Sequence, residues 1–314
     1  MGNKLIVTAA PHITGPDTTQ KIMQRVCIAL LPTLIASILI FGINSLILTV
    51  ITVAACMFFE WGYCKLVGRE VPVGDFSAAV TGVLLAFNLP ATLPWWMAIV
   101  GAFIAIVIVK QLFGGLGYNV ANPAIVARIA LAMGFASRMA NYPHPANGID
   151  ALASATPLAV SGDLGAANYV TLLLGNHGGV LGETCAITLL LGGIYLIATK
   201  VISPVIPVTY LATVAVLSAV SGHDPIVQLL SGGLMLGAFF MATDYVTSPT
   251  TNKGKLVFGI GLGIITCAIR FLGTMNEGVS FAILLMNLLV PYIEILTRQD
   301  RLGIAKAKKE GAAK

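Results

Sequence analysis

Long apolar runs separated by short polar breaks make up most of the chain. A helix that crosses a membrane needs about 20 predominantly apolar residues. The pattern predicts about ten such helices, with approximate ranges 24–42, 45–64, 75–90, 94–112, 122–139, 179–199, 202–221, 226–242, 255–273 and 279–297. We therefore expect an all-α polytopic membrane protein.

Composition strengthens this expectation. The 314 residues are 57% hydrophobic and only 10% charged, whereas soluble domains carry about 25% charged residues. Too many polar residues precede the first apolar run for the N-terminus to be a cleaved signal peptide, so we expect it to be kept.

The placement of lysine and arginine predicts how the chain is oriented, because cytoplasmic loops are enriched in these residues. With the N-terminus inside and the predicted helices alternating, all 18 basic residues except Arg128, Arg138 and Arg270 lie inside. The bias predicts that both termini are cytoplasmic and that the polar loop 140–178 is outside. The net charge of +5 is thus explained by one membrane face and does not indicate nucleic-acid binding.

A weak internal repeat divides the predicted helices into two halves. The stretch at 81–94 echoes 231–249, and the stretch at 109–131 echoes 268–289. Halves of about five helices each would be inverted relative to each other, an architecture with sites where the halves meet. The alternative is that glycine-rich membrane helices resemble one another by composition alone. The predicted division is a cytoplasmic N-terminal segment, a first half, an outward loop, a second half and a basic cytoplasmic tail, at 1–22, 23–139, 140–178, 179–297 and 298–314.

Arg128, Arg270 and Glu60 fall inside predicted helices, where ionisable groups are costly and point to function. Arg128 and Arg270 lie at matching places in the two halves. Either arginine is a candidate to hold a phosphate, a carboxylate or an anionic reduced flavin. The alternatives are snorkelling to the lipid headgroups or pairing with a helix C-terminus. Glu60, near the inner end of its helix, is predicted to snorkel.

Two polar breaks at the predicted inner face are candidates for an ion inlet. They are GYNVANPA at 117–124 and MATDYVTSPTT at 241–251. The polar side chains that would line such a site are Asn119, Asn122, Asp244, Thr247, Ser248 and Thr250. The alternative is helix capping, which is favoured for Asn122 because a proline follows it. Asp244 is the candidate ion-pathway residue.

Other site types lack support in the sequence. None of the five cysteines forms a CxxC pair, and the four histidines lack ligand spacing. We interpret the cysteines as small buried hydrophobes. The chain contains no Walker loop, no GxGxxG after a strand and no Ser/His/Asp arrangement. We therefore assign no catalytic residue, no metal ligand and no cluster or haem to this chain alone.

The stretch NGIDALASATPLAV at 147–160 lies in the polar loop and contains an accessible threonine. Pro157 disfavours helix at Thr156. Small side chains on the N-terminal side leave the Thr156 hydroxyl open to a bulky reagent, and these are Ala151, Ala153, Ser154 and Ala155. Such a threonine suits a modification acceptor, and the alternative is an ordinary Ser/Thr turn.

DALASATPL resembles the flavinylation motif shared by the RnfD protein of the Rnf complex and the related NqrB protein of the sodium-pumping NADH:quinone reductase. That pattern is roughly Asp, two variable residues, Ser or Thr, Gly, Ala, Thr, often followed by Pro-Leu. The matching residues are Asp150, Ala155, Thr156, Pro157 and Leu158. Ala153 stands where Ser or Thr is usual, and Ser154 where Gly is usual. The polar breaks extend the resemblance over nearly the whole chain, and the length is more similar to RnfD.

The resemblance implies that Thr156 carries FMN through a phosphoester bond to its hydroxyl. A separate flavin transferase would install the group from FAD on the outer side, and Asp150 would belong to the sequence that this enzyme reads. Ser154, Ala155 and Pro157 would flank the linkage. A second, non-covalent flavin such as riboflavin is also implied within the helix bundle, with no residues assigned to it.

The resemblance further implies a component of a complex in the bacterial cell membrane. Together with other Rnf-type subunits, the chain would relay electrons between reduced ferredoxin and NAD while Na+ or H+ crosses the membrane. It is not expected to be active alone. Two alternatives stay open: a channel or transporter for a small polar solute, and a scaffold protein that has lost its flavin.

Overall fold

The chain is all-helical throughout the part that the structure, a computed structural model, describes, with no strand in it. That part comprises residues 17–69, 73–142, 166–175, 177–183, 185–273 and 278–298. The helices of the first part of the chain are α1 (Thr19–Phe41), α2 (Ile43–Val67), η1 (Val73–Asp75), α3 (Ser77–Phe87), α4 (Trp95–Phe103), η2 (Ile104–Gln111), α5 (Pro123–Gly134) and α6 (Ala136–Met139). The later helices are α7 (Ala166–Leu174), α8 (Ala186–Ala198), α9 (Val205–Val220), α10 (Pro225–Leu230), α11 (Leu234–Leu236), η5 (Gly237–Met241), α12 (Asn252–Leu272) and α13 (Val279–Leu296).

Four of the described helices, namely α1, α2, α12 and α13, are long and apolar enough to cross a membrane. Five shorter apolar helices accompany them, at Ser77–Phe87, Trp95–Gln111, Pro123–Gly134, Ala186–Ala198 and Val205–Val220. The predicted class, an all-α membrane protein with several spans, is confirmed. The number of about ten spans and the inversion of the two halves stay predictions.

Several predicted helices differ from the structure. The range 122–139 is divided at Phe135 into α5 and α6. The range 226–242 is interrupted after α10, because Gly232 and Gly233 adopt positive φ values of 70° and 67°. Such left-handed backbone is tolerated by glycine and ends an α-helix. The range 179–199 begins its helix only at Ala186, and residues 177–183 before it are a buried non-helical segment.

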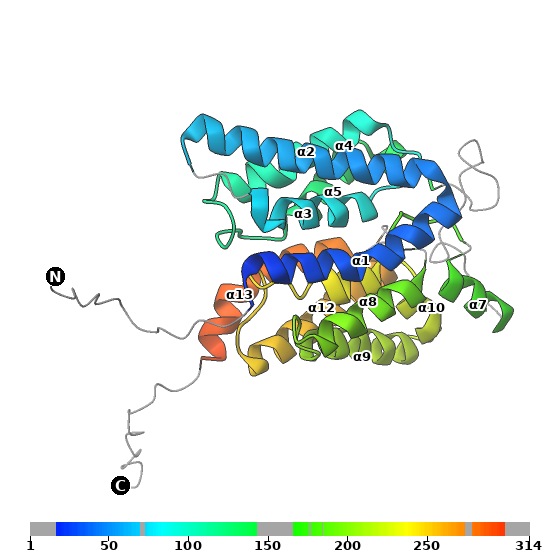
Figure 1. Cartoon of the computed structure of the whole chain (residues 1–314). Coiled ribbons are helices and arrows are strands. Elements are labelled where there is room, and N and C mark those ends of the chain that lie inside the picture. The colour runs from blue at the N-terminus through cyan, green and yellow to red at the C-terminus, as the bar shows by residue number, and fades with distance from the viewer. Residues whose placement is uncertain are drawn as a thin grey trace, which may run out of the picture.

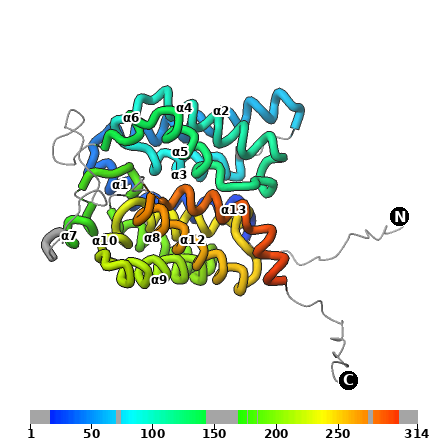
Figure 2. Tube along the Cα trace, turned by 180° about the vertical axis from the view of Figure 1, so that it is seen from behind, coloured from blue at the N-terminus to red at the C-terminus, as the bar shows by residue number. Residues whose placement is uncertain are grey.

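The helices form two groups with a helix pair between them (Figures 1 and 2). One group contains α2, α3, α4 and α5, and the other contains α8, α9, α10 and α12. The helices α1 and α13 lie between the groups, where α1 contacts α8 as well as α2, and α13 contacts α5 as well as α12.

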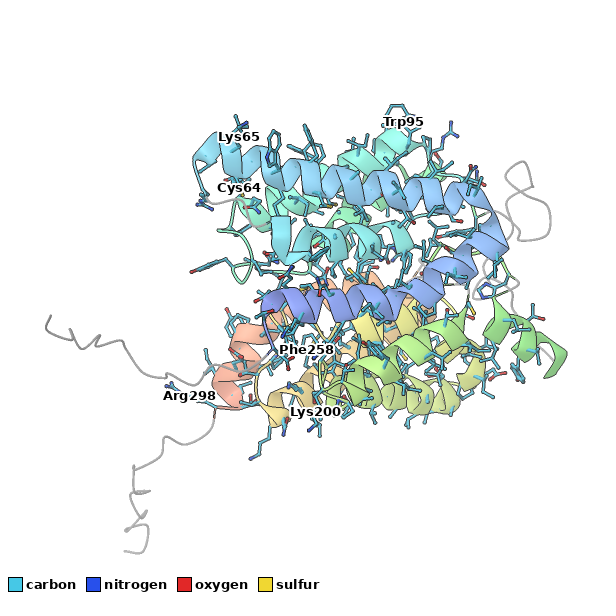
Figure 3. The ribbon with its side chains drawn as sticks, viewed as in Figure 1. Cys64, Lys65, Trp95, Lys200, Phe258 and Arg298 are labelled. Atoms are coloured by element: carbon cyan, nitrogen blue, oxygen red, sulfur yellow. The ribbon has the colours of Figure 1, made fainter. Side chains whose placement is uncertain are left out.

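The bundle has two ends, which we name by what they carry. The terminal end is the one where the described chain begins before α1 and stops after α13. Lys65 and Arg298 lie there, as Figure 3 shows. The loop end is the opposite one, where α7 lies.

Glycines of α8 allow this helix to pack closely against α1 and η5. A Cβ atom on Gly192 would lie 2.4 Å from the Ala29 carbonyl oxygen of α1, and one on Gly193 would lie 2.4 Å from the Phe239 ring. Small residues at such contacts let membrane helices approach closely, which strengthens van der Waals packing.

We predict that Gly192→Ala destabilises the protein by about 1–3 kcal/mol, because backbone cannot move aside as a flexible side chain can. Gly62→Ala in α2 is the matched control, because a Cβ there meets nothing within 4 Å. Thermal unfolding of the detergent-purified protein should show a lower midpoint for Gly192→Ala alone. Equal midpoints for the two variants would contradict the close contact.

Candidate functional site

A cavity of about 230 Å³ opens among α1, α3, η2 and η5 near the terminal end. Most of its wall is apolar, with Phe239 and Phe240 among the lining side chains. Its polar lining includes Ser77 of α3, Lys110 of η2, Asn119 and Asn122 before α5, and Asp244 after η5. We call it the terminal-end cavity.

A buried ion pair forms part of the cavity wall. The Lys110 Nζ atom lies 2.7 Å from Glu60 Oε1, and the two side chains are 2% and 0% exposed. The same ammonium donates to the Ser77 hydroxyl at 2.6 Å. The prediction that Glu60 snorkels to the headgroups is therefore wrong. Its carboxylate is held inside the bundle because a lysine on a neighbouring helix compensates its charge.

The π-helix η2 explains how two consecutive residues reach one carboxylate. Lys110 and Gln111 are its last residues, and the Gln111 amide donates to Glu60 Oε1 at 3.0 Å. The wider turns of a π-helix are frequently found at functional sites. The second carboxylate oxygen, Glu60 Oε2, is buried and accepts no hydrogen bond among the described residues.

The two polar breaks meet beside this network, as an inlet would require. Asn119, Asn122 and Asp244 line the terminal-end cavity. Asn122 also caps α5 as predicted, accepting from the Ala124 amide at 3.1 Å, and it donates to the Met241 carbonyl at 3.4 Å. The capping and lining roles are thus compatible.

The other residues of the second break surround Asp244. The Thr247 hydroxyl donates to Asp244 Oδ2 at 3.1 Å. Burial raises the pKa of the Asp244 carboxyl, and this hydrogen bond lowers it in part. Ser248 and Thr250 line a neighbouring cavity of about 250 Å³, whereas Thr247 lines neither cavity.

Arg270, at the loop end of α12, caps a neighbouring helix. Its guanidinium donates to the Gln228 carbonyl at 2.6 Å and to the Ser231 carbonyl at 2.9 Å. It also contacts the Gln228 side chain and the Gly232 carbonyl. These oxygens lie at and just beyond the C-terminus of α10, where a cation is favourable. The arrangement matches the alternative of pairing with a helix C-terminus, with the half-buried guanidinium at the loop end.

Arg128 in α5 joins the two groups of helices. It is 7% exposed and donates to the Ser280 hydroxyl of α13. A second guanidinium nitrogen lies 3.6 Å from Glu183 Oε1 in the segment before α8. Arg128 therefore does not snorkel, and its charge is matched by a buried carboxylate.

The flavinylation-like motif lies outside the described residues, including Asp150, Ser154, Ala155, Thr156 and Pro157. Its described flanks are attached to the bundle. Before the loop, the Asn141 carbonyl accepts from the Thr92 hydroxyl at 2.9 Å. After it, Tyr169 of α7 donates to Asp224 at the start of α10.

Metal chemistry gains no support from the described part of the chain. No group of three His, Cys, Asp or Glu residues that could hold a metal occurs there. All five cysteines are free thiols, and all but Cys27 are buried, as expected for small apolar side chains.

Comparison with known proteins places these features in a family. The model of the NQR2, RnfD, RnfE family matches residues 6–303. The chain belongs to this family. Among the similar relatives of this NQR2, RnfD, RnfE protein is the D component of the Na(+)-translocating ferredoxin:NAD(+) oxidoreductase complex of Acetobacterium woodii, 46% identical over 98% of both chains. The D component of the proton-translocating ferredoxin:NAD(+) oxidoreductase complex of Clostridium ljungdahlii is 38% identical over 96% of this chain and 97% of that protein. The D component of the ion-translocating oxidoreductase complex of Stutzerimonas stutzeri is 38% identical over 95% and 96%.

Glu183, Ser280 and the Glu60–Lys110 network were not predicted from the sequence. A signal for the network was present, because Lys110 and Gln111 end an apolar run at the same predicted face as Glu60. Pairing them required knowing which helices are neighbours.

Proposed function

We propose that this chain is the RnfD-type component of an ion-translocating ferredoxin:NAD oxidoreductase complex. The observation that carries the proposal is the near full-length identity of 46% with the Acetobacterium woodii relative. Such a chain acts within a complex, and the redox partners are the other Rnf-type subunits. The membrane class of the fold agrees with this role.

We further propose that Thr156 carries FMN as a phosphoester, installed by a flavin transferase that reads Asp150 and its neighbours. Support comes from the match of the DALASATPL stretch to the flavinylation motif. When bound, the flavin supplies the redox chemistry of the protein, and the chain supplies position and electrostatics. The chain's own contribution at the loop end is a fixed charge distribution around Arg128, Glu183 and Arg270.

The terminal-end cavity is our candidate for the second, non-covalent flavin. Its apolar wall includes two phenylalanines, and its polar edge offers Lys110 and Asn119 for hydrogen bonding. Ligand sites commonly combine an apolar wall with a few placed polar groups. Asn119 Oδ1 is buried and accepts no hydrogen bond among the described residues, so a donor on a ligand would satisfy it.

The same region is our candidate for entry of the coupling ion. Asp244 lines the cavity, and the Glu60 carboxylate lies behind Lys110 with one oxygen unsatisfied. Either carboxylate offers a binding point for Na+ or H+. Moving one charge against 100 mV costs about 2.3 kcal/mol, which a redox step can supply.

The proposed orientation places the terminal end in the cytoplasm. Lys21, Arg25, Lys65, Arg69 and Lys253 all lie in or beside the parts of α1, α2 and α12 that face this end. Cytoplasmic enrichment of basic residues supports this arrangement. It puts Thr156 on the outer side, where the transferase would act.

The proposal is tested with the purified complex in sealed vesicles. Reduced ferredoxin and NAD+ should drive ion accumulation, measured with radioactive sodium in one arm and a pH-sensitive dye in the other. Asp244→Asn should reduce ion accumulation more than NAD+ reduction. Solute flux that is independent of ferredoxin and NAD+, without any redox-driven ion movement, would favour the channel alternative instead.

A further inference from the structure

The second cavity, of about 250 Å³, lies among residues at the starts of α9 and α12 and in the loop that joins η5 to α12. We call it the hydroxyl cavity, because its polar lining consists of one lysine and five hydroxyl side chains, namely Ser203, Thr243, Tyr245, Ser248, Thr250 and Lys255. Among the described residues that line it, none is acidic. The start of α12 places this cavity at the terminal end of the bundle (Figure 1).

Three donors of the hydroxyl cavity have no partner within the described chain. Ser248 is 9% exposed, and its hydroxyl forms no hydrogen bond with a described residue. The half-buried Ser203 hydroxyl likewise forms none there, and the half-buried Lys255 ammonium forms neither a hydrogen bond nor an ion pair. Because buried polar groups are normally hydrogen-bonded, these donors point to a ligand.

The other hydroxyls of the cavity are already committed to the protein. Tyr245 donates to the Val201 carbonyl, and Thr243 donates to a carbonyl of η5 at 2.7 Å. The Thr250 hydroxyl and amide donate to the Glu294 carboxylate at 3.1 Å and 3.2 Å. These bonds fix the wall of the cavity and leave the three unpartnered donors for a ligand.

The charges around the hydroxyl cavity favour an anion. Lys255 lies in the first turns of α12, whose N-terminus carries a partial positive charge. Thr251 caps this helix and accepts from only one of its first amides. Glu294 does not line the cavity, and the nearby Asp17 and Arg25 pair with each other at 2.9 Å. The cation that faces the cavity is therefore not neutralised by a carboxylate in its lining.

A phosphate group matches these donors, and a lipid matches the surface beside them. Phosphate oxygens accept several charge-assisted hydrogen bonds, which an ammonium and two hydroxyls can donate. The helices that begin at the cavity carry exposed apolar side chains, with Val208 of α9 61% exposed and Leu256 of α12 46% exposed. Since α12 is long and apolar enough to cross a membrane, such side chains suit contact with acyl chains. Basic pockets between membrane helices bind anionic lipid headgroups in this way.

We propose that the hydroxyl cavity binds the phosphate of an anionic phospholipid from the leaflet at the terminal end. Lys255 pairs with the phosphate, Ser203 and Ser248 donate to it, and the acyl chains lie against the outer faces of α9 and α12. A lipid with a single net negative charge, such as phosphatidylglycerol, matches the single cation of the lining. Binding needs neither a flavin nor electron transfer, so the inference is independent of the proposed function.

The experiment locates the lipid by photochemical labelling of the purified complex in mild detergent. The probe is phosphatidylglycerol with a diazirine on its acyl chain close to the glycerol. After illumination, mass spectrometry should find the label on peptides from the first turns of α9 and α12. Unlabelled phosphatidylglycerol should compete with the probe, and phosphatidylcholine, which has no net charge, should compete much less.

Three variants test the donors at a probe concentration below saturation. Lys255→Met should lower the labelling about tenfold, through loss of a charge-assisted hydrogen bond, and Ser248→Ala should lower it about threefold. Lys253→Met is the matched control, because Lys253 is exposed in the same turn but does not line the cavity. It should label like the parent. If Lys255→Met does not assemble, Lys255→Arg replaces it and should stay near the parent, because it keeps the charge.

The outcomes that overturn the inference are distinct. Equal losses in Lys255→Met and Lys253→Met would leave only a general attraction by the basic face. Equal competition by phosphatidylcholine would contradict the preference for an anionic lipid. A separate arm adds inorganic phosphate and follows thermal unfolding. A midpoint raised by phosphate in the parent but not in Lys255→Met, without lipid labelling at α9 and α12, would assign the cavity to a soluble phosphate and overturn the lipid.

Discussion

Thr156→Ala should abolish both the covalent flavin of this protein and ferredoxin-dependent NAD+ reduction by the complex. The phosphoester needs the hydroxyl oxygen, which alanine lacks, and without the tether the flavin no longer has a high local concentration at the loop end. The expected change is complete loss of ultraviolet fluorescence from the denatured protein. Electron transfer should fall to the background of a complex that lacks this chain.

Thr156→Ser is the matched variant, because it keeps a hydroxyl at the same position. It should retain some flavin if the transferase accepts serine, and electron transfer should scale with the fraction labelled. Fluorescence is measured on a denaturing gel, and staining that gel for protein shows that all preparations contain equal amounts of the chain. Full electron transfer by an unlabelled Thr156→Ala complex would contradict a role for the tethered flavin.

Lys110→Met should have the largest effect on stability among single changes at the terminal end. It leaves the Glu60 carboxylate buried without its cation, 0% exposed and with one oxygen already lacking a donor. Breaking a buried pair by removing one partner costs about 3–5 kcal/mol. The measurement is thermal unfolding of the detergent-purified complex, followed by size-exclusion chromatography.

Two comparisons isolate the charge effect. The double variant Lys110→Met with Glu60→Gln removes both charges and should recover most of the lost stability. Lys65→Met is the control for loss of a lysine, because Lys65 is exposed and lies 4.9 Å from the Trp61 ring centroid. An exposed contact of that kind contributes about 0.5–1 kcal/mol. Equal destabilisation by Lys110→Met and Lys65→Met would mean that the buried ion pair contributes no more to stability than an exposed lysine.

Local features of the fold could be predicted from the sequence. Asn122 before Pro123 correctly predicted a capped helix start, because the cap is formed by residues next to each other. The apolar runs predicted the membrane class, because the hydropathy of a helix also depends on residues that are contiguous in the sequence. The interruption of the 226–242 range was missed, because its apolar residues continue past Gly232 and Gly233 and hydropathy does not report backbone dihedrals.

The charged contacts were harder to predict, because they depend on which helices are neighbours. Glu60 and Lys110 are 50 positions apart, and Arg128 reaches Ser280 across 152. For each arginine, the sequence also allowed snorkelling or pairing with a helix C-terminus. The structure shows that Arg270 caps the C-terminus of α10, which the sequence alone could not place beside it. The chemistry of Thr156 rests on sequence similarity, since its loop lies outside the described residues.

The most direct test of the central claim is the mass of the peptide that contains Thr156, taken from the complex purified from cells with their own flavin transferase. We predict that this peptide is heavier by one FMN group less one water, with fragmentation placing the addition on Thr156. The unmodified peptide at full abundance, in a complex that still couples ferredoxin oxidation to ion movement, would contradict the account.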